Sequence, residues 1–289
     1  MHRQILRYVT HACSVFCEYL ASESERVKAA GFSAMRLLLS HGLKPRFFVI
    51  KGDSGQGGST STDKMLELLK FDALSLSAEV ENTRRGQTTF KNNLTPQERI
   101  VIHMCYLMTT RFQPEYDRVL KLVQTFIAKV GSALQAQQLN DFLLVVSEVK
   151  VGRDGYEAWE DCLGTFMQVM GAERFFQQLP LRLSDFDMNS LTYAQDSRSY
   201  LLQIARYKLK RADLKFFVEY FVPTLKNLEA QRQTNMRQTR EDYSAIKAKK
   251  NETLIVQIWE LLPIFLRQNS TKLGSAFASL LEPLEQMVN

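Results

Sequence analysis

The amino-acid sequence predicts an all-α protein whose helices stack in pairs as an α-solenoid. Apolar residues recur at helical spacing along most of the 289-residue chain, and helix-breaking residues divide it at short intervals. Prolines also recur at a near-constant distance in the C-terminal half. A compact helical bundle is the alternative architecture, because it shares the helical spacing and the short connections.

Three segments show the helical pattern most clearly. Residues 116–130, 214–228 and 254–266 each carry apolar residues three and four positions apart, which line one face of a helix. The runs RFFVIK (46–51) and FLLVVSEV (142–149) are short and apolar, so periodicity leaves buried strand and buried helix open for both. No segment alternates strictly over strand length with hairpin turn signals at its ends, which favours helices throughout.

Helix breakers interrupt this pattern at short intervals, which is typical of helix pairs joined by brief turns. The interruptions fall at residues 41–45, 92–96, 111–114, 151–155, 179–187 and 267–274. Residues 51–64 and 82–95 are rich in Gly, Ser, Thr and Asn, and we expect them to be flexible loops. The chain is therefore expected to consist of helical repeats.

The prolines of the C-terminal half indicate the type of repeat. Pro180, Pro223 and Pro263 each follow an aliphatic residue, which belongs to an aliphatic or aromatic pair at Pro223 and Pro263, and the prolines are separated by 43 and 40 residues. HEAT and armadillo helix pairs repeat about every 40 to 47 residues. A proline inside a helix bends its axis, which suits the outer helix of a curved stack. We therefore expect a HEAT/armadillo-like α-solenoid.

The composition indicates a protein of a reducing compartment, without a membrane span. Four cysteines in 289 residues are too few for the disulfide framework of a secreted protein, so we expect free thiols. The longest apolar stretch, residues 254–266, contains polar residues and a proline, and it is shorter than the roughly 20 residues that cross a bilayer.

Positive charge is concentrated in one segment. The chain has a net charge of +6, and residues 206–250 hold twelve Lys or Arg against five Asp or Glu. Such a segment predicts contacts with a polyanion, nucleic acid first of all, although a charge run is also typical of the solvated side of a helix. The candidate phosphate-binding residues are Arg206, Lys208, Lys210, Arg211, Arg237, Arg240, Lys247, Lys249 and Lys250.

No motif in the sequence points to catalysis. The segment KGDSGQGGST (51–60) approaches a phosphate-binding loop, but Gly58 stands where that loop needs a lysine, and a parallel sheet is not predicted. Cys13 and Cys17 lie four residues apart without a second ligand pair at zinc spacing, so buried small side chains are the better interpretation. His103 lies in an apolar run and is expected in the core. We expect no enzyme, no cofactor, no metal and no small-molecule substrate.

The C-terminal segments resemble a known family. FFQQLPLRL (175–183), SYLLQIARYKLKRADLKFFVEYFVPTLKNLEA (199–230), KKNETLIVQIWELLPIFL (249–266) and AFASLLEPLEQMV (276–288) are similar, in content and order, to the HEAT-type domain of the ribosomal RNA processing protein twelve family. The resemblance extends over about residues 171–289, and it implies a division into N-terminal helical repeats over 1–170 and family-matching HEAT-type repeats over 171–289. Members of that family are much longer HEAT-repeat proteins.

This resemblance implies a non-enzymatic assembly factor of the small ribosomal subunit, located in the nucleolus and nucleus. It implies binding to pre-ribosomal RNA and to assembly proteins within a large ribonucleoprotein particle, and a role in processing and export. The alternative is a karyopherin-like transport receptor or cargo adaptor that uses protein surfaces only. Such receptors tend to be acidic because their cargo signals are basic, so a pI near 9.1 disfavours that alternative.

Overall fold

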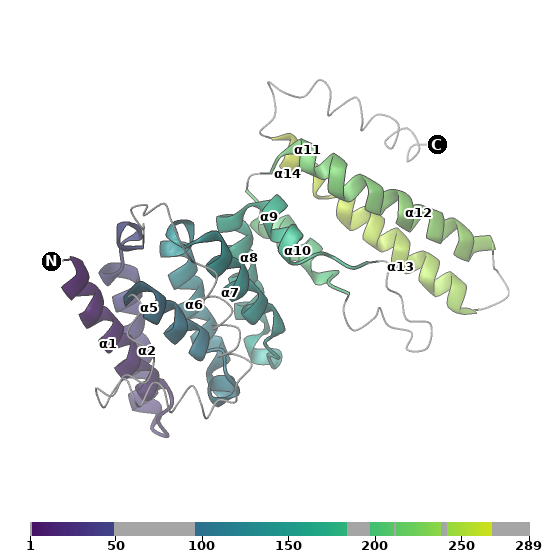
Figure 1. Cartoon of the computed structure of the whole chain (residues 1–289). Helices are drawn as coiled ribbons and strands as arrows, with labels where there is room; N and C mark the ends of the chain where they lie inside the picture. The colour runs from purple at the N-terminus through teal and green to yellow at the C-terminus, as the bar shows by residue number, and fades with distance from the viewer. Residues whose placement is uncertain (1, 49–95, 184–196, 211, 238–241, 268–289) are drawn as a thin grey trace. The chain divides into compact units, whose positions relative to one another are not determined.

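The computed structural model describes residues 2–48, 96–183, 197–210, 212–237 and 242–267. In these ranges the regular elements are α-, 3-10 and π-helices, and no strand occurs there, so the all-α prediction is confirmed (Figure 1). The expected loops at 51–64 and 82–95 lie outside the described residues. The chain divides into two compact units, Met1–Val169 and Met170–Asn289, each of which is described by itself.

The first unit is a succession of packed helices. Helix α1 packs against α2 and α5, and α2 and η1 pack against α6. The elements are α1 (His2–Leu20), α2 (Glu25–Leu37), η1 (Leu38–Gly42), η2 (Pro45–Phe47), α5 (Pro96–Tyr106), η3 (Thr110–Glu115), α6 (Tyr116–Val130), η4 (Gly131–Ala133), α7 (Ala136–Glu148), η5 (Arg153–Gly155) and α8 (Tyr156–Met170).

Aromatic side chains join α6, α7 and α8 in the core of this unit. The ring centroids of Phe126 and Phe142 are 6.3 Å apart, and those of Phe142 and Phe166 are 5.6 Å apart. All three side chains are fully buried. The run FLLVVSEV therefore belongs to a helix, and RFFVIK contributes Arg46 and Phe47 to the 3-10 helix η2. Both short apolar runs were ambiguous because burial on several sides hides the helical period.

Helices α1 and α2 approach each other closely at Gly31, which has no side chain. A Cβ atom at Gly31 would lie 2.7 Å from the Cβ of Tyr19, so any larger residue would push the helices apart. Cys13 and Cys17 are buried on the inner face of α1, and Cys105 and Cys162 are buried in α5 and α8. All four are free thiols, as predicted.

The second unit is built around a long helical hairpin. Its elements are α9 (Ala172–Gln178), α10 (Tyr200–Lys208), α11 (Leu214–Phe216), η6 (Phe217–Phe221), α12 (Val222–Arg237), α13 (Asp242–Trp259) and α14 (Leu262–Leu266). Helices α12 and α13 run side by side (Figure 1). Asn251 Nδ2 donates a hydrogen bond of 3.5 Å to Gln231 Oε1, which fixes the antiparallel register.

One end of this hairpin is anchored in an aromatic core. Phe176 of α9 packs on Phe221 at 5.5 Å between ring centroids, and Phe217 packs on Phe265 of α14 at 5.1 Å. The four rings are fully buried. Toward the other end of the hairpin few apolar residues remain, because α12 continues from Leu228 to Arg237 with mostly polar residues. The hairpin therefore has an apolar base and a polar tip.

The three repeated prolines have different structural roles. Pro223 lies inside a continuous helical stretch and directly follows the π-helical turn η6, in which the N–H of Val222 bonds to the carbonyl of Phe217. A π-helical turn changes the pattern of backbone hydrogen bonds, and here it lies next to Pro223, which has no N–H to donate. Pro180 follows the end of α9, and Pro263 occupies the first turn of α14. Only Pro223 is therefore a proline within a helix, as was expected for all three.

Candidate nucleic-acid interface

Helix α10 has one buried face and one polar, exposed face. Leu201, Leu202, Ile204 and Ala205 are almost fully buried, which fixes the orientation of the helix. The residues on the opposite side follow one another three and four positions apart and form an exposed stripe. We call this stripe the α10 face; its members are Gln203, Arg206 and Tyr207, and Lys210 follows two residues after the end of the helix.

Arg206 is held in place on the α10 face. Its Nη1 lies 2.7 Å from Oε2 of Glu260, just after the end of α13, and both side chains are partly exposed. A pair of this kind contributes little to stability, about 0 to 1 kcal/mol, but it orients the guanidinium group. The guanidinium carbon also lies 5.9 Å from the ring centroid of Tyr207. Arg206 thus joins α10 to α13 and borders an exposed aromatic ring.

Lys208 and Lys210 lie at the C-terminal end of α10. Lys208 is half-buried, whereas Lys210 is exposed beyond the helix end. Cations near this end of a helix are favoured by the helix dipole, which gives both lysines a local role whether or not they contact RNA. Arg211, the next predicted phosphate contact, lies outside the described residues.

A second basic group lies toward the tip of the α12–α13 hairpin. Arg237 ends α12, and Lys247, Lys249 and Lys250 occupy the N-terminal half of α13, so the antiparallel register brings them to the same end. Lys249 and Arg237 are exposed, and Lys249 Nζ pairs with Glu252 Oε2 at 3.0 Å. Lys247 and Lys250 are half-buried. We call these four residues the tip group; Arg240 lies outside the described residues.

The two groups lie at different levels of the same hairpin. Glu260, the partner of Arg206, is ten residues from Lys250 along α13, which corresponds to about 15 Å of helix. The described members of the predicted phosphate contacts therefore do not form one compact cluster. They form the tip group and a second group, which we call the base group and which consists of Arg206, Lys208 and Lys210; both lie within the second unit.

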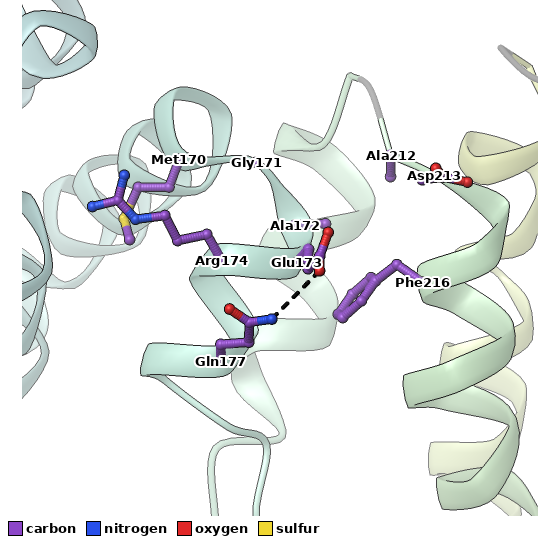
Figure 2. A pocket seen from close by; sticks show the side chains of 9 residues that line it. All are labelled: Met170, Gly171, Ala172, Glu173, Arg174, Gln177, Ala212, Asp213 and Phe216. Carbon is purple, nitrogen blue, oxygen red and sulfur yellow. Dashed lines mark hydrogen bonds between the residues drawn. The ribbon is translucent and has the colours of Figure 1, made fainter. Parts of the chain in front are cut away.

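A small pocket lies in the same unit, between α9 and the start of α11 (Figure 2). Its volume is about 350 Å³ and its lining includes Gly171, which has a φ of +81°. Glu173 accepts a hydrogen bond of 3.4 Å from Gln177, and Asp213 Oδ1 accepts one of 2.9 Å from the backbone N–H of Lys215. Both carboxylates are thus engaged within the protein. The nine lining residues include neither histidine nor cysteine, so the pocket offers no nucleophile and base pair.

His103 and the four cysteine thiols are buried. His103 is 5% exposed and its Nδ1 lies 2.6 Å from the carbonyl oxygen of Arg99, so it is a core residue as predicted. Burial lowers the pKa of His103 and raises the pKa of Cys13 to about 12. Burial also raises the pKa of Cys17 well above its ordinary value, so both thiols of α1 stay protonated.

The described part of the chain contains neither a cluster of metal-binding side chains nor a helix that could span a membrane. Within it, no three His, Cys, Asp or Glu residues come close enough together to hold a metal ion. No helix in these ranges is long and apolar enough to cross a membrane.

Sequence reasoning named Arg206 of the α10 face and missed Tyr207 and Gln203 beside it. Tyr207 is 75% exposed, whereas tyrosines are usually at least partly buried. The spacing of Gln203, Arg206 and Tyr207 was the available signal, because it places all three on the side of α10 opposite its leucines.

Comparison with known proteins shows the family. A family model described as ribosomal RNA-processing protein 12, HEAT repeats, matches residues 59–289. A Schizosaccharomyces pombe protein named as a ribosomal RNA-processing protein 12 is 28% identical over 181 residues, which cover 61% of this chain and 14% of that protein. An RRP12-like protein of Gallus gallus is 26% identical over 193 residues, covering 63% of this chain and 13% of the relative. This chain thus spans only about a seventh of the length of these relatives.

The family match begins well before residue 171, where the C-terminal resemblance starts, and it includes most of the first unit. It confirms the predicted HEAT-type α-solenoid and the predicted resemblance. On this evidence the chain belongs to the HEAT-repeat family of ribosomal RNA-processing protein 12.

Proposed function

We propose that this chain is a non-enzymatic scaffold of ribosome biogenesis that binds pre-ribosomal RNA and assembly proteins. It acts during maturation and export of the small subunit, in small-subunit processome or pre-40S particles of the nucleolus and nucleus. Membership of a ribosomal RNA-processing family supports the process. The observation that carries RNA binding is the position of basic residues on exposed helical surfaces of the second unit.

The hairpin suits an extended polyanion better than a small anion. Helix α13 has 18 residues and is therefore about 27 Å long, and the base and tip groups lie at different levels along it. An RNA backbone that follows the hairpin would meet positive charge at both levels. Contacts of this kind release counterions and give affinity that is largely independent of sequence. Recognition of a particular site would then depend on the shape of the particle and on partner proteins.

A non-enzymatic role agrees with the chemistry of the described residues. His103 and the thiols of Cys13 and Cys17 are buried, and their pKa shifts favour the uncharged forms. Helical repeats instead provide long surfaces that bind macromolecules. Binding to proteins alone, as in a transport receptor, is the alternative that the experiment must separate from RNA binding.

Charge reversal on the two basic groups tests the proposal. The variant Arg206→Glu, Lys210→Glu, Arg237→Glu, Lys249→Glu changes exposed residues of both groups. Four lost phosphate contacts would reduce the slope of log affinity against log salt by about 3 for a single-stranded RNA, and weaken binding steeply at low salt. The measurement is filter binding of a small-subunit ribosomal RNA fragment over a range of salt concentrations.

A matched control separates local contacts from total charge. The variant Arg7→Glu, Arg26→Glu, Arg36→Glu, Lys129→Glu makes the same change in net charge on exposed helical residues of the first unit. We expect it to keep most of the affinity and the original slope. Equal losses of affinity in both variants would mean that RNA binding depends only on the net charge of the chain. Unchanged binding in both variants would remove RNA binding from the proposed function.

A further inference from the structure

The aromatic ring of Tyr207 is unusually accessible for a helical residue. The side chain is 75% exposed, although the helix that carries it is packed into the second unit through Leu201, Leu202 and Ala205. These buried residues keep the backbone of α10 in place, so the ring stands on a rigid element. An exposed ring on a rigid helix offers a flat, apolar surface with little conformational entropy left to lose on binding.

The surroundings of the ring are those of a site for a base and its phosphates. The guanidinium of Arg206 lies 5.9 Å from the ring centroid and is oriented by Glu260 at 2.7 Å. Gln203, one turn before Tyr207, adds an amide that can pair with a base edge, and Lys210, three residues after Tyr207 and beyond the end of α10, adds an exposed ammonium group. A stacking surface, a hydrogen-bonding amide and a guanidinium group therefore share the α10 face, with a lysine after the C-terminal end of the helix.

We propose that Tyr207 is the stacking platform for an unpaired base of single-stranded RNA, with Arg206 and Lys210 beside it as phosphate contacts. The inference rests on the proposed function, and it names the class of RNA bound at the α10 face. Bases in a duplex are stacked on one another and do not expose their faces, so an aromatic platform selects single strands. The contacts of Arg206 and Lys210 alone would not make this distinction.

The surroundings of the ring favour RNA over a protein partner. Protein hot spots that contain tyrosine or arginine lie near the centre of an interface, within a ring of contacts that excludes water. Tyr207 instead stands beside exposed polar groups, the amide of Gln203 and the guanidinium of Arg206, and the ammonium of Lys210 follows beyond the helix end. An exposed aromatic ring beside cations fits the alternation of base and phosphate along an RNA strand.

Three variants of the full chain test the inference. Tyr207→Ala removes the ring, Tyr207→Phe keeps it, and Tyr8→Ala removes an equally exposed ring from α1 of the first unit, where Tyr8 is 76% exposed. Because Tyr207 and Tyr8 are both on the surface, neither alanine variant should unfold. Circular dichroism and thermal melting confirm this before binding is measured.

The probes are a short oligouridylate, an abasic ribose-phosphate strand of equal length and an RNA duplex. We expect Tyr207→Ala to weaken oligouridylate binding at least about fivefold, as the loss of one stacked base implies. Its affinity for the abasic strand and for the duplex should stay unchanged. Tyr207→Phe and Tyr8→Ala should bind all three probes like the unaltered protein. The salt slope of Tyr207→Ala should not change, since tyrosine carries no charge.

The outcomes distinguish this inference from the proposed function. If the unaltered protein binds oligouridylate and Tyr207→Ala binds it equally well, the stacking platform is wrong while RNA binding stands. If Tyr207→Ala loses affinity for the abasic strand or the duplex to the same extent, the ring does not stack a base. If the unaltered protein binds none of the probes and no ribosomal RNA fragment, RNA binding itself fails.

Discussion

His103 shows how burial of a single residue links stability to pH. Its ring is buried in α5, and Nδ1 lies against the carbonyl of Arg99. Burial lowers its pKa below the ordinary value of 6.5, so the folded protein keeps the ring neutral at pH values where the unfolded chain already binds a proton. The contribution of His103 is therefore fully present above the unfolded pKa and is lost as pH falls.

We expect the free energy of unfolding to decrease between about pH 7 and pH 5, with part of the decrease assigned to His103. Urea denaturation of the unaltered protein and of His103→Gln at several pH values measures this part. The variant should show a shallower pH dependence, whatever its absolute stability. An identical pH dependence in both proteins would mean that His103 is as accessible to protons in the folded state as in the unfolded one.

The sequence predicted burial better than exposure. Cys13, Cys17 and His103 were expected to be buried, the cysteines because free cysteine is among the most buried residue types and His103 because it lies in an apolar run. Tyr207 was missed because aromatic residues are ordinarily assigned to the core, and only the geometry of α10 shows its side chain facing outward. The pairing of Arg206 with Glu260 joins residues 54 positions apart, which periodicity within one helix does not reveal.

Helix α13 has one buried face and one exposed face. Ile258 is fully buried against the rest of the unit, whereas Val256, two residues earlier, is 52% exposed. Removing the buried side chain costs both its transfer free energy and a cavity. We expect Ile258→Ala to lower the free energy of unfolding by about 2 to 5 kcal/mol.

Val256→Ala is the matched control, since it truncates a β-branched residue of the same helix at an exposed position. We expect this change to stay within about 0.5 kcal/mol. The midpoints of urea denaturation measure both effects. Similar losses in the two variants would contradict the assignment of buried and exposed faces on α13.

Element boundaries followed from the sequence where the apolar stripe was complete. The stripe over 116–130 predicted α6, whose bounds are Tyr116–Val130. The stripe over 214–228 predicted the helical stretch that starts at Leu214, but the helix continues to Arg237. Its last part is polar, and α13 packs alongside it, so the extension depends on a tertiary partner that a pattern within one helix does not show.

At the scale of the whole molecule, the repeat period predicted the architecture before any relative was compared. Proline intervals of 43 and 40 residues indicated HEAT or armadillo pairs, and the match to a HEAT-repeat family over residues 59–289 confirms this. The nine predicted phosphate contacts lie within one 45-residue segment of the sequence, but the seven that the structure describes lie at two levels of the hairpin. Residues far apart along one long helix are also far apart in space, at about 1.5 Å per residue, and composition alone does not show this separation.

The central claim is that this chain binds pre-ribosomal RNA through the base and tip groups of the second unit. The most direct test is crosslinking of the tagged protein in cells, followed by sequencing of the attached RNA, for the unaltered chain and for the fourfold reversal at Arg206, Lys210, Arg237 and Lys249. We predict crosslinks concentrated in small-subunit ribosomal RNA or its spacers, and their loss in the variant. A profile of protein partners without crosslinked ribosomal RNA would contradict the claim.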